Sequence, residues 1–315
     1  MSSQLVDINA DGHQDILVGS FSGVPQLIKG SQDGYQEPEP IMDSANNTVL
    51  ISAFWNKETS KWDETDRSQT EGHCTSASAV DWDNDGDLDL VLGDYYGGRL
   101  YLRLNEGTAE KPSFVTTNSA IEADGAPIVI EKGLAAPNIV DWDGDGLFDI
   151  LCGGSKGGVF LFKNEGQTDT PEFAAVETLV EPIIGDAFIK KVPSYNGQPT
   201  QPGSSFHVDA TDYDGDGDLD LLVGSRCSWD KESVKILSDE EQKRLAEIEK
   251  KIKDTQAQLM ELTKAAETDE QKEALAKNED YVKTRKEYSE LFRQKKELDV
   301  EPTDSGDFVW LLRRK

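Results

Sequence analysis

The stretch DWDNDGDLDL, residues 81–90, places five aspartates in nine positions and runs directly into an apolar segment. Carboxylates this close together repel one another, and unpaired anions held within a few ångströms lower the stability of a fold. Aspartate is also depleted in strands, whereas the apolar residues that follow are strand formers. The density of negative charge therefore needs a physical compensation, and the rest of the sequence helps to identify it.

The same nine-residue pattern, Asp-x-(Asp/Asn)-x-Asp-Gly-x-x-Asp, occurs four times. The four copies are 7–15, 81–89, 141–149 and 212–220. Each copy leads into a short apolar strand that ends in glycine: Ile16–Gly19, Leu90–Gly93, Ile150–Gly153 and Leu221–Gly224. Copies two and three continue with a Gly-Gly turn and another strand, at 99–104 and 159–163. A unit that recurs at intervals of roughly 60–75 residues predicts a repeat architecture.

Each repeat is predicted to hold about four strands: one before the acidic copy, one after it, one after the glycine turn, and an outer one. Four strands per repeat are typical of one blade of a β-propeller. We therefore predict an all-β fold, a β-propeller of four countable four-stranded repeats that stands alone or forms part of a larger propeller. The predicted repeats span about 1–75, 76–135, 136–205, and 206–237 together with 300–315.

The fourth repeat is interrupted by a predicted helical insertion at 238–299. Ser238 and Glu241 form the sequence signature of a capping box. The apolar residues that follow keep a spacing of three or four: Leu245, Ile248, Ile252, Leu259 and Leu262. A second helix is predicted to start at Thr268, with an apolar stripe of Leu275, Val282 and Phe292, widened by Tyr281, Tyr288, Leu291 and Leu298. The two helices are expected to form an antiparallel hairpin, and the missing third strand to follow at 307–314.

The acidic copies have the ligand chemistry of a hard divalent cation. Ca²⁺ takes roughly six to eight oxygen ligands, and side chains at positions 1, 3 and 5 of a tight loop point at one centre. Glycine at position 6 allows the sharp turn. Position 7 offers its carbonyl, and the aspartate at position 9 closes the cage from the start of the next strand. We predict about four calcium sites, the first being the weakest because Asn9 lowers the ligand charge.

The predicted side-chain ligands are Asp7, Asn9, Asp11, Asp15, Asp81, Asp83, Asp85, Asp89, Asp141, Asp143, Asp145, Asp149, Asp212, Asp214, Asp216 and Asp220. The predicted backbone carbonyl ligands are His13, Asp87, Leu147 and Asp218. Asp87 is expected to turn its carboxylate to solvent. An EF-hand is excluded, because its loop needs a carboxylate at position 12 and flanking helices. Position 12 is apolar in every copy: Val18, Leu92, Cys152 and Val223.

Composition bears on whether the protein binds nucleic acid, spans a membrane, is secreted or forms disulfides. The chain has 32 basic and 61 acidic residues and a net charge of −29, which argues against a nucleic-acid binder. No apolar run approaches the length of a membrane helix. The start of the chain lacks the features of a secretory leader, so a natural leader would be absent from this chain. The three cysteines allow at most one internal disulfide, and a bridge between Cys74 and Cys227 stays open.

The repeats resemble the FG-GAP/VCBS repeat family, calcium-loop β-propellers also found in the heads of integrin α-subunits. The resemblance covers most of residues 1–228 and 305–315. It implies cation ligands at positions 1, 3, 5 and 9 of each loop, a carbonyl ligand at position 7, and a structural role for the ion. The chain departs from integrin-type propellers, which have seven blades, and the helical hairpin is not part of the family pattern.

Three functions follow from these observations. The first is a calcium-stabilised, non-catalytic scaffold for binding or adhesion, extracellular, at the cell surface or periplasmic, which holds a protein or glycan partner. Its long connections (33–75, 115–136 and 177–206) would carry specificity. The second is a polysaccharide lyase or hydrolase, with His13, His73, His207, Tyr95, Tyr96 and Arg99 as candidate side chains. The third is a coiled-coil arm for self-association or docking. The aromatic residues at loop position 2 (Trp82, Trp142 and Tyr213) are expected to pack between blades rather than stack on sugars.

Overall fold

The computed structural model describes residues 3–20, 23–51, 54–56, 61–63, 75–95, 97–131, 133–183, 191–232, 237–264, 269–298 and 303–314. The chain divides into two compact units. The first consists of Met1–Pro193, Pro199–Ser228 and Ser305–Lys315, and the second of Ser194–Gln198 and Trp229–Asp304.

The first unit is built from four antiparallel sheets. The first sheet contains β1 (Ser3–Val6), β2 (Asp15–Val18), β3 (Gln26–Ile28) and β4 (Glu39–Pro40). The second contains β7 (Thr75–Val80), β8 (Asp89–Asp94), β9 (Leu100–Arg103) and β10 (Ser119–Ala120). The third contains β13 (Ala136–Val140), β14 (Asp149–Gly153), β15 (Val159–Phe162) and β16 (Glu177–Val180). The fourth contains β19 (Ser204–Thr211), β20 (Asp220–Asp230) and β21 (Thr303–Leu312).

Three small two-stranded sheets complete the strands of the described chain. They are β5 (Phe54–Asn56) with β6 (Lys61–Asp63), β11 (Glu122–Ala123) with β12 (Ala126–Pro127), and β17 (Ser194–Tyr195) with β18 (Gln198–Pro199).

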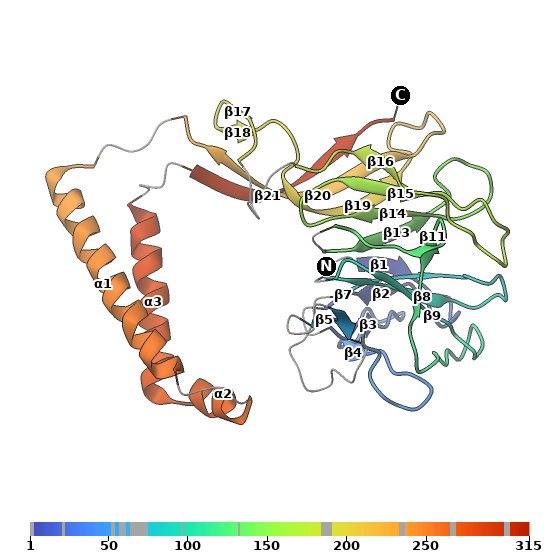
Figure 1. The fold of residues 1–315 in the computed structure, drawn as a ribbon, viewed down its shortest axis with the longest axis horizontal. Helices are drawn as coiled ribbons and strands as arrows, with labels where there is room; N and C mark the ends of the chain where they lie inside the picture. The colour runs from blue at the N-terminus through green and yellow to red at the C-terminus, as the bar shows by residue number, and fades with distance from the viewer. Residues whose placement is uncertain are drawn as a thin grey trace. The chain divides into compact units, whose positions relative to one another are not determined.

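The four main sheets follow one another in chain order. The first strand of each sheet contacts the first strand of the next, so β1, β7, β13 and β19 form a series (Figure 1). An apolar cluster fills each of the three spaces between successive sheets. Side chains alternate between these clusters: Leu90 and Leu92 lie in one, and Val91 in the next. The succession is propeller-like, although the described residues do not show a closed ring.

Glycine at the end of a second strand lets the next sheet approach closely. A Cβ added to Gly93 would lie 2.0 Å from the carbonyl oxygen of Ala135, and one added to Gly153 would lie 2.2 Å from that of Phe206. At Gly224, on the fourth sheet, the nearest atom would be 3.7 Å away. The recurrent glycine is therefore a packing requirement in the second and third sheets, at Gly93 and Gly153.

The predicted strand after the insertion is confirmed. It is β21, which pairs beside β20 although the helical segment separates the two in the chain. The fourth sheet thus obtains its third strand from the C-terminal part of the chain, and its described residues form three strands rather than the predicted four.

The second unit contains three helices: α1 (Asp239–Thr263), α2 (Asp269–Ala276) and α3 (Glu279–Glu297). The capping box of Ser238 and Glu241 forms as predicted. The single second helix predicted from Thr268 is wrong, because the side chain of Asn278 accepts a hydrogen bond from the amide of Tyr281 at 3.0 Å and starts a new helix. Thr268 itself lies outside the described residues. None of these helices is long and apolar enough to cross a membrane.

Helices α1 and α3 run antiparallel and pack against each other (Figure 1). Ile248 and Thr255 of α1 are buried, as are Leu291 in α3 and Leu298 at its C-cap. The predicted stripe on the second helix is partly wrong. Val282 and Phe292 are 48% and 45% exposed, so the seam follows the heptad of Leu291 and Leu298 instead.

Candidate metal centre

The four acidic loops are the segments 7–15, 81–89, 141–149 and 212–220, each between the first and second strands of its sheet. Glycine at position 6 has a left-handed φ of 86° to 97° in all four loops, as the pattern predicts. Position 4 is left-handed too, and the sequence interpretation missed it. Ala10 and Asn84 have φ values of 50° and 59°, and Gly144 and Gly215 both have 76°. The glycine or asparagine in three of the four copies was the available signal.

The carboxylate at position 1 holds each turn together. One oxygen of Asp81 accepts a hydrogen bond from the amide of Asp85, and the other accepts one from Gly86, both at 3.1 Å. The same pair of bonds occurs in the other three loops, at Asp7, Asp141 and Asp212, with donor–acceptor distances of 2.9–3.2 Å. Each loop therefore has a defined conformation that its own residues stabilise.

The carboxylate at position 9 is buried and links its loop to the end of the third strand through two hydrogen bonds; we call this carboxylate the clamp. Asp89 is 1% exposed, and its two oxygens accept hydrogen bonds from the amides of Trp82 (2.9 Å) and Asn105 (2.6 Å). The first donor belongs to loop position 2, and the second follows the third strand of the sheet. The clamp recurs at Asp15, Asp149 and Asp220, whose donors after the third strand are Gly30, Asn164 and Arg314. This carboxylate ties the loop to the sheet.

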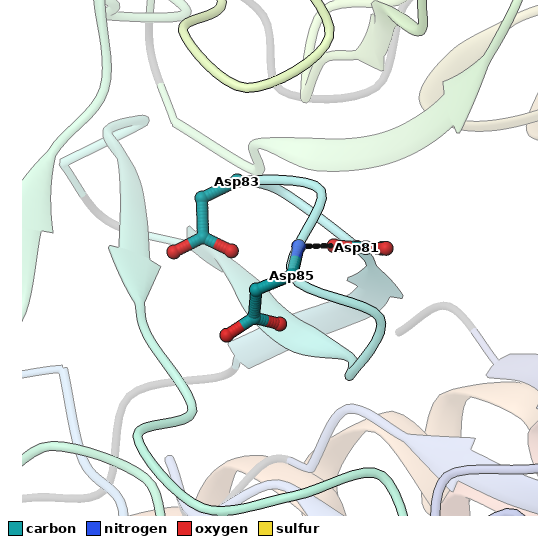
Figure 2. Close-up of side chains that lie close together, drawn as sticks. All are labelled: Asp81, Asp83 and Asp85. Carbon is teal, nitrogen blue, oxygen red and sulfur yellow. Dashed lines mark hydrogen bonds between the residues drawn. The ribbon is translucent and has the colours of Figure 1, made fainter.

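Three loops bring candidate ligands together. One oxygen from each member lies within 4.8 Å of the others in the groups Asp81–Asp83–Asp85, Asp141–Asp143–Asp149 and Asp212–Asp214–Asp216. Figure 2 shows Asp83 and Asp85 pointing to the same side of the second loop, while Asp81 accepts the hydrogen bond from the Asp85 amide. The Asp83 Oδ1 atom is buried and has no hydrogen-bond partner within the described part of the chain. An orphaned anionic oxygen is a place where a cation fits.

Burial changes the pKa of carboxyls in the second and third loops. It raises the pKa of Asp89 to about 6, although the amides of Asn105 and Trp82 oppose the shift. Burial likewise raises the pKa of Asp149, against the amides of Asn164 and Trp142. Both shifts mean that the negative charge is costly in these loops without a compensating cation.

The prediction for Asp87 is wrong. Its carboxylate does not turn to solvent: the residue is 4% exposed, and its Oδ1 atom has no hydrogen-bond partner among the described residues. Burial and then the neighbouring charge of Asp85 raise its pKa, while a hydrogen bond from the Asn105 side chain lowers it. The position-7 residue of the fourth loop, Asp218, is exposed.

Basic side chains pair with position 3 in two of the loops. The Lys163 ammonium lies 3.2 Å from Asp143 Oδ2, and the Arg313 guanidinium lies 3.2 Å from Asp214 Oδ2. The hydrogen bond to Asp143 raises the pKa of Lys163. In the first loop, the Asn9 amide donates to the Asp11 carboxylate at 3.1 Å. Basic or amide side chains thus contact candidate ligands in the first, third and fourth loops.

The aromatic residues at loop position 2 pack between sheets, as predicted, in two of three cases. The Trp82 ring lies 5.3 Å from that of Phe148 on the third sheet's loop, measured between centroids. Trp142 is 7% exposed, and the Arg314 guanidinium lies 4.9 Å from its ring centroid. Tyr213 is 60% exposed, because among the described residues no sheet follows the fourth.

The candidate catalytic side chains belong to three different sheets or their loops. His13 lies in the first acidic loop, Tyr95 and Arg99 flank the turn between β8 and β9, and His207 lies in β19. Burial lowers the pKa of His207 to about 4, so its imidazole is neutral near pH 7. His73 and Tyr96 lie outside the described residues.

Two of the three cysteines are described. Cys152 and Cys227 are buried free thiols, and burial raises the pKa of Cys152 to about 12. Cys152 is therefore not a thiolate nucleophile at neutral pH. Cys74, the partner considered for Cys227, lies outside the described residues.

The model of the FG-GAP-like repeat family matches residues 7–92 and 141–223, which together are more than half of the chain. The two matched segments contain all four acidic loops. A search of curated proteins finds no match.

Proposed function

Because the chain belongs to the FG-GAP-like repeat family, we propose that it is a calcium-stabilised, propeller-type scaffold that binds a partner without catalysing a reaction. One observation carries the proposal: the same hydrogen-bonded acidic loop occurs in four sheets, and three copies gather carboxylates within 4.8 Å. The high negative charge suits a calcium-rich environment, so we place the protein outside the cytoplasm, extracellular, at the cell surface or periplasmic.

Calcium is the ion that fits these donors. All of them are oxygens, which hard cations prefer, and the loops lack the histidine and cysteine side chains that zinc favours, apart from His13. The side chains at positions 1, 3, 5 and 9, which are carboxylates except for the Asn9 amide, and the carbonyl at position 7 would hold it. In each loop the bound ion would offset the repulsion between carboxylates and join the turn more firmly to its sheet.

The experiment is thermal unfolding in EDTA and in millimolar CaCl₂. If calcium is present at roughly a hundred times its Kd, one site raises the melting temperature by about 5 °C or more. The variant Asp83→Asn should lose part of this rise, while Glu290→Gln on α3 should keep all of it. A melting temperature that calcium leaves unchanged would reject the structural role of the ion.

A protein partner is favoured by an apolar cavity of about 630 Å³ in the first unit. Ile128, Phe160 and Pro182 line it, and Val129 and Val176 on its wall are 51% and 53% exposed. Two acidic residues, Asp124 and Glu131, and one lysine, Lys156, also line it. The cavity lining thus combines exposed aliphatic side chains with a net negative charge. Such a lining is complementary to a partner that presents an apolar side chain flanked by basic residues. The sugar-stacking alternative has less support, because Trp82 and Trp142 pack within the fold.

Arrays of peptides and of glycans, probed with the calcium-loaded protein, separate these partner classes. We expect peptides with an apolar residue between basic residues to bind. Val176→Asp should weaken that binding at least about tenfold, because it places a charge on the cavity wall. Val309→Asp is the matched control, since Val309 is 75% exposed on β21 and does not line this cavity. Binding to glycans alone would overturn the protein-partner proposal.

Self-association through the helices is a second candidate, favoured by exposed apolar side chains. Met260 is 66% exposed, and Val282 and Phe292 are about half exposed. Light scattering of the wild type and of a Met260→Ser/Phe292→Ser variant tests it. A monomeric mass for the wild type would reject this role.

A further inference from the structure

The third and fourth acidic loops carry a built-in counter-cation at the same structural place. Lys163 pairs with Asp143, and Arg313 pairs with Asp214. Each base directly precedes the residue whose amide donates to the position-9 clamp, Asn164 in the third sheet and Arg314 in the fourth. The two bases are therefore equivalent in position. Lys163 follows β15 directly after the turn from β14, whereas Arg313 follows β21, which the helical segment separates from β20 in the chain.

The second loop has no basic residue at the equivalent position. The equivalent residue is Leu104, which directly precedes the clamp donor Asn105 and has no charge. The carboxylate that a base would pair with is Asp83. Its Oδ1 atom is one of two buried carboxylate oxygens in this loop, with that of Asp87, that have no hydrogen-bond partner among the described residues. The difference between the loops thus coincides with one residue at the end of the third strand.

The first loop differs in another way. Its equivalent base is Lys29, which pairs with Glu39 rather than with a loop residue. Position 3 is Asn9, whose amide donates to the Asp11 carboxylate. The first loop therefore has fewer anionic ligands and already satisfies one of them internally.

We infer that Lys163 and Arg313 are tethered competitors of the bound cation, so that the second loop takes up a divalent cation before the other three. The inference rests on the proposed function as a calcium-binding scaffold. A cation that enters the third or fourth loop must displace a basic group from a ligand carboxylate and then tolerate its charge nearby. An exposed ion pair contributes at most about 1 kcal/mol, which is about fivefold in affinity, and the displaced base also repels the bound ion. Together the two effects lower affinity by about five- to tenfold rather than abolishing binding.

The test uses Tb³⁺ as a luminescent substitute for Ca²⁺, excited through the tryptophan at loop position 2. Trp82 reports on the second loop and Trp142 on the third, and a Trp82→Phe background isolates the third. We expect Lys163→Met to tighten binding in the third loop about fivefold or more. Leu104→Lys should weaken binding in the second loop by a similar factor, because it adds the missing competitor.

Lys29→Met is the matched control, since it removes the equivalent base that pairs with Glu39 instead of a loop ligand. It should change Tb³⁺ affinity in the second and third loops less than about twofold. Calorimetric titration with Ca²⁺ repeats the comparison without a substitute ion, and adds Arg313→Met for the fourth loop.

The possible outcomes distinguish failure of this inference from failure of the proposed calcium-binding function. If wild-type protein binds Ca²⁺ but Lys163→Met and Leu104→Lys leave every affinity within twofold, the competition is wrong and the calcium scaffold stands. If the third loop fills before the second in the wild type, the predicted order is overturned. If the wild type gives neither binding heat nor sensitised emission, both the inference and the proposed function are rejected.

Discussion

The third and fourth acidic loops have nearly the same sequence and the same backbone conformation, yet they have different neighbours. Both have glycine at positions 4 and 6, and both use positions 1 and 9 as backbone hydrogen-bond acceptors. Trp142 in the third loop is 7% exposed because the fourth sheet covers it, whereas Tyr213 in the fourth is 60% exposed. The comparison shows that nine residues suffice to shape the loop, while its burial depends on what packs next to it.

The clamp at position 9 also has the same geometry in the two loops although its donors lie at different distances along the chain. Asp149 accepts from Asn164, fifteen residues later in the chain, whereas Asp220 accepts from Arg314, ninety-four residues later. The helical segment between β20 and β21 leaves the clamp geometry unchanged. In this chain the clamp therefore needs a third strand beside the loop, but not one that is close in the chain.

The largest expected effect separates the two position-2 aromatics. Trp142→Ala should lower the free energy of unfolding by about 4 kcal/mol, because it opens a cavity between the third and fourth sheets. Tyr213→Ala should lower it by less than about 0.5 kcal/mol, since the ring is largely exposed. Urea unfolding measures both values. Equal losses would show that Tyr213 is covered and that the comparison between the loops fails.

A second prediction concerns the glycine at the end of the second strand. Gly153→Ala should destabilise the protein by about 3 kcal/mol, because its Cβ would lie 2.2 Å from the Phe206 carbonyl oxygen and force β19 to move. Gly224→Ala meets only an ordinary contact at 3.7 Å and should change stability by less than about 0.5 kcal/mol. Thermal unfolding of the two variants side by side checks this. A tolerated Gly153→Ala would mean that the sheets are less closely packed than the structure indicates.

The smallest expected effect is the pH dependence of stability that arises from Asp89 in the second loop. Asp89 has a folded-state pKa of about 6, above the unfolded value of roughly 3.9, so the native state binds the extra proton between these pH values. Its contribution is fully present below about pH 4 and is lost as pH rises through about 6, a decline of slightly less than about 3 kcal/mol. Urea unfolding in metal-free buffer from pH 4 to 7 measures it.

Asp89→Asn is the control, because the amide cannot titrate, and it should show a shallower decline over the same pH range. Calcium should reduce the decline in the wild type, since a bound cation favours the ionised carboxylate. A variant whose stability varies with pH as steeply as the wild type would assign the effect to other carboxyls.

Much of the fold could be predicted from local patterns. The apolar run of Leu90, Val91 and Leu92 predicts a short strand, and the structure buries that strand on both faces, between two apolar clusters. The strand after the insertion and the capping box at Ser238 were predicted as well. The break at Asn278 was not, because a cap competes with helix continuation only through one side-chain hydrogen bond that periodicity does not register.

The candidate metal site likewise has features that follow from local sequence and features that depend on tertiary contacts. The turn of each acidic loop can be predicted from local sequence, since its conformation follows from glycine at position 6 and from hydrogen bonds within nine residues. Tertiary contacts account for the burial of Asp87 and for the pairing of Lys163 and Arg313 with position 3. They also leave the Asp83 oxygen without a partner among the described residues. The physical reason is range: backbone turns are settled by neighbours in the chain, whereas burial and ion pairing depend on strands that fold beside the loop from elsewhere.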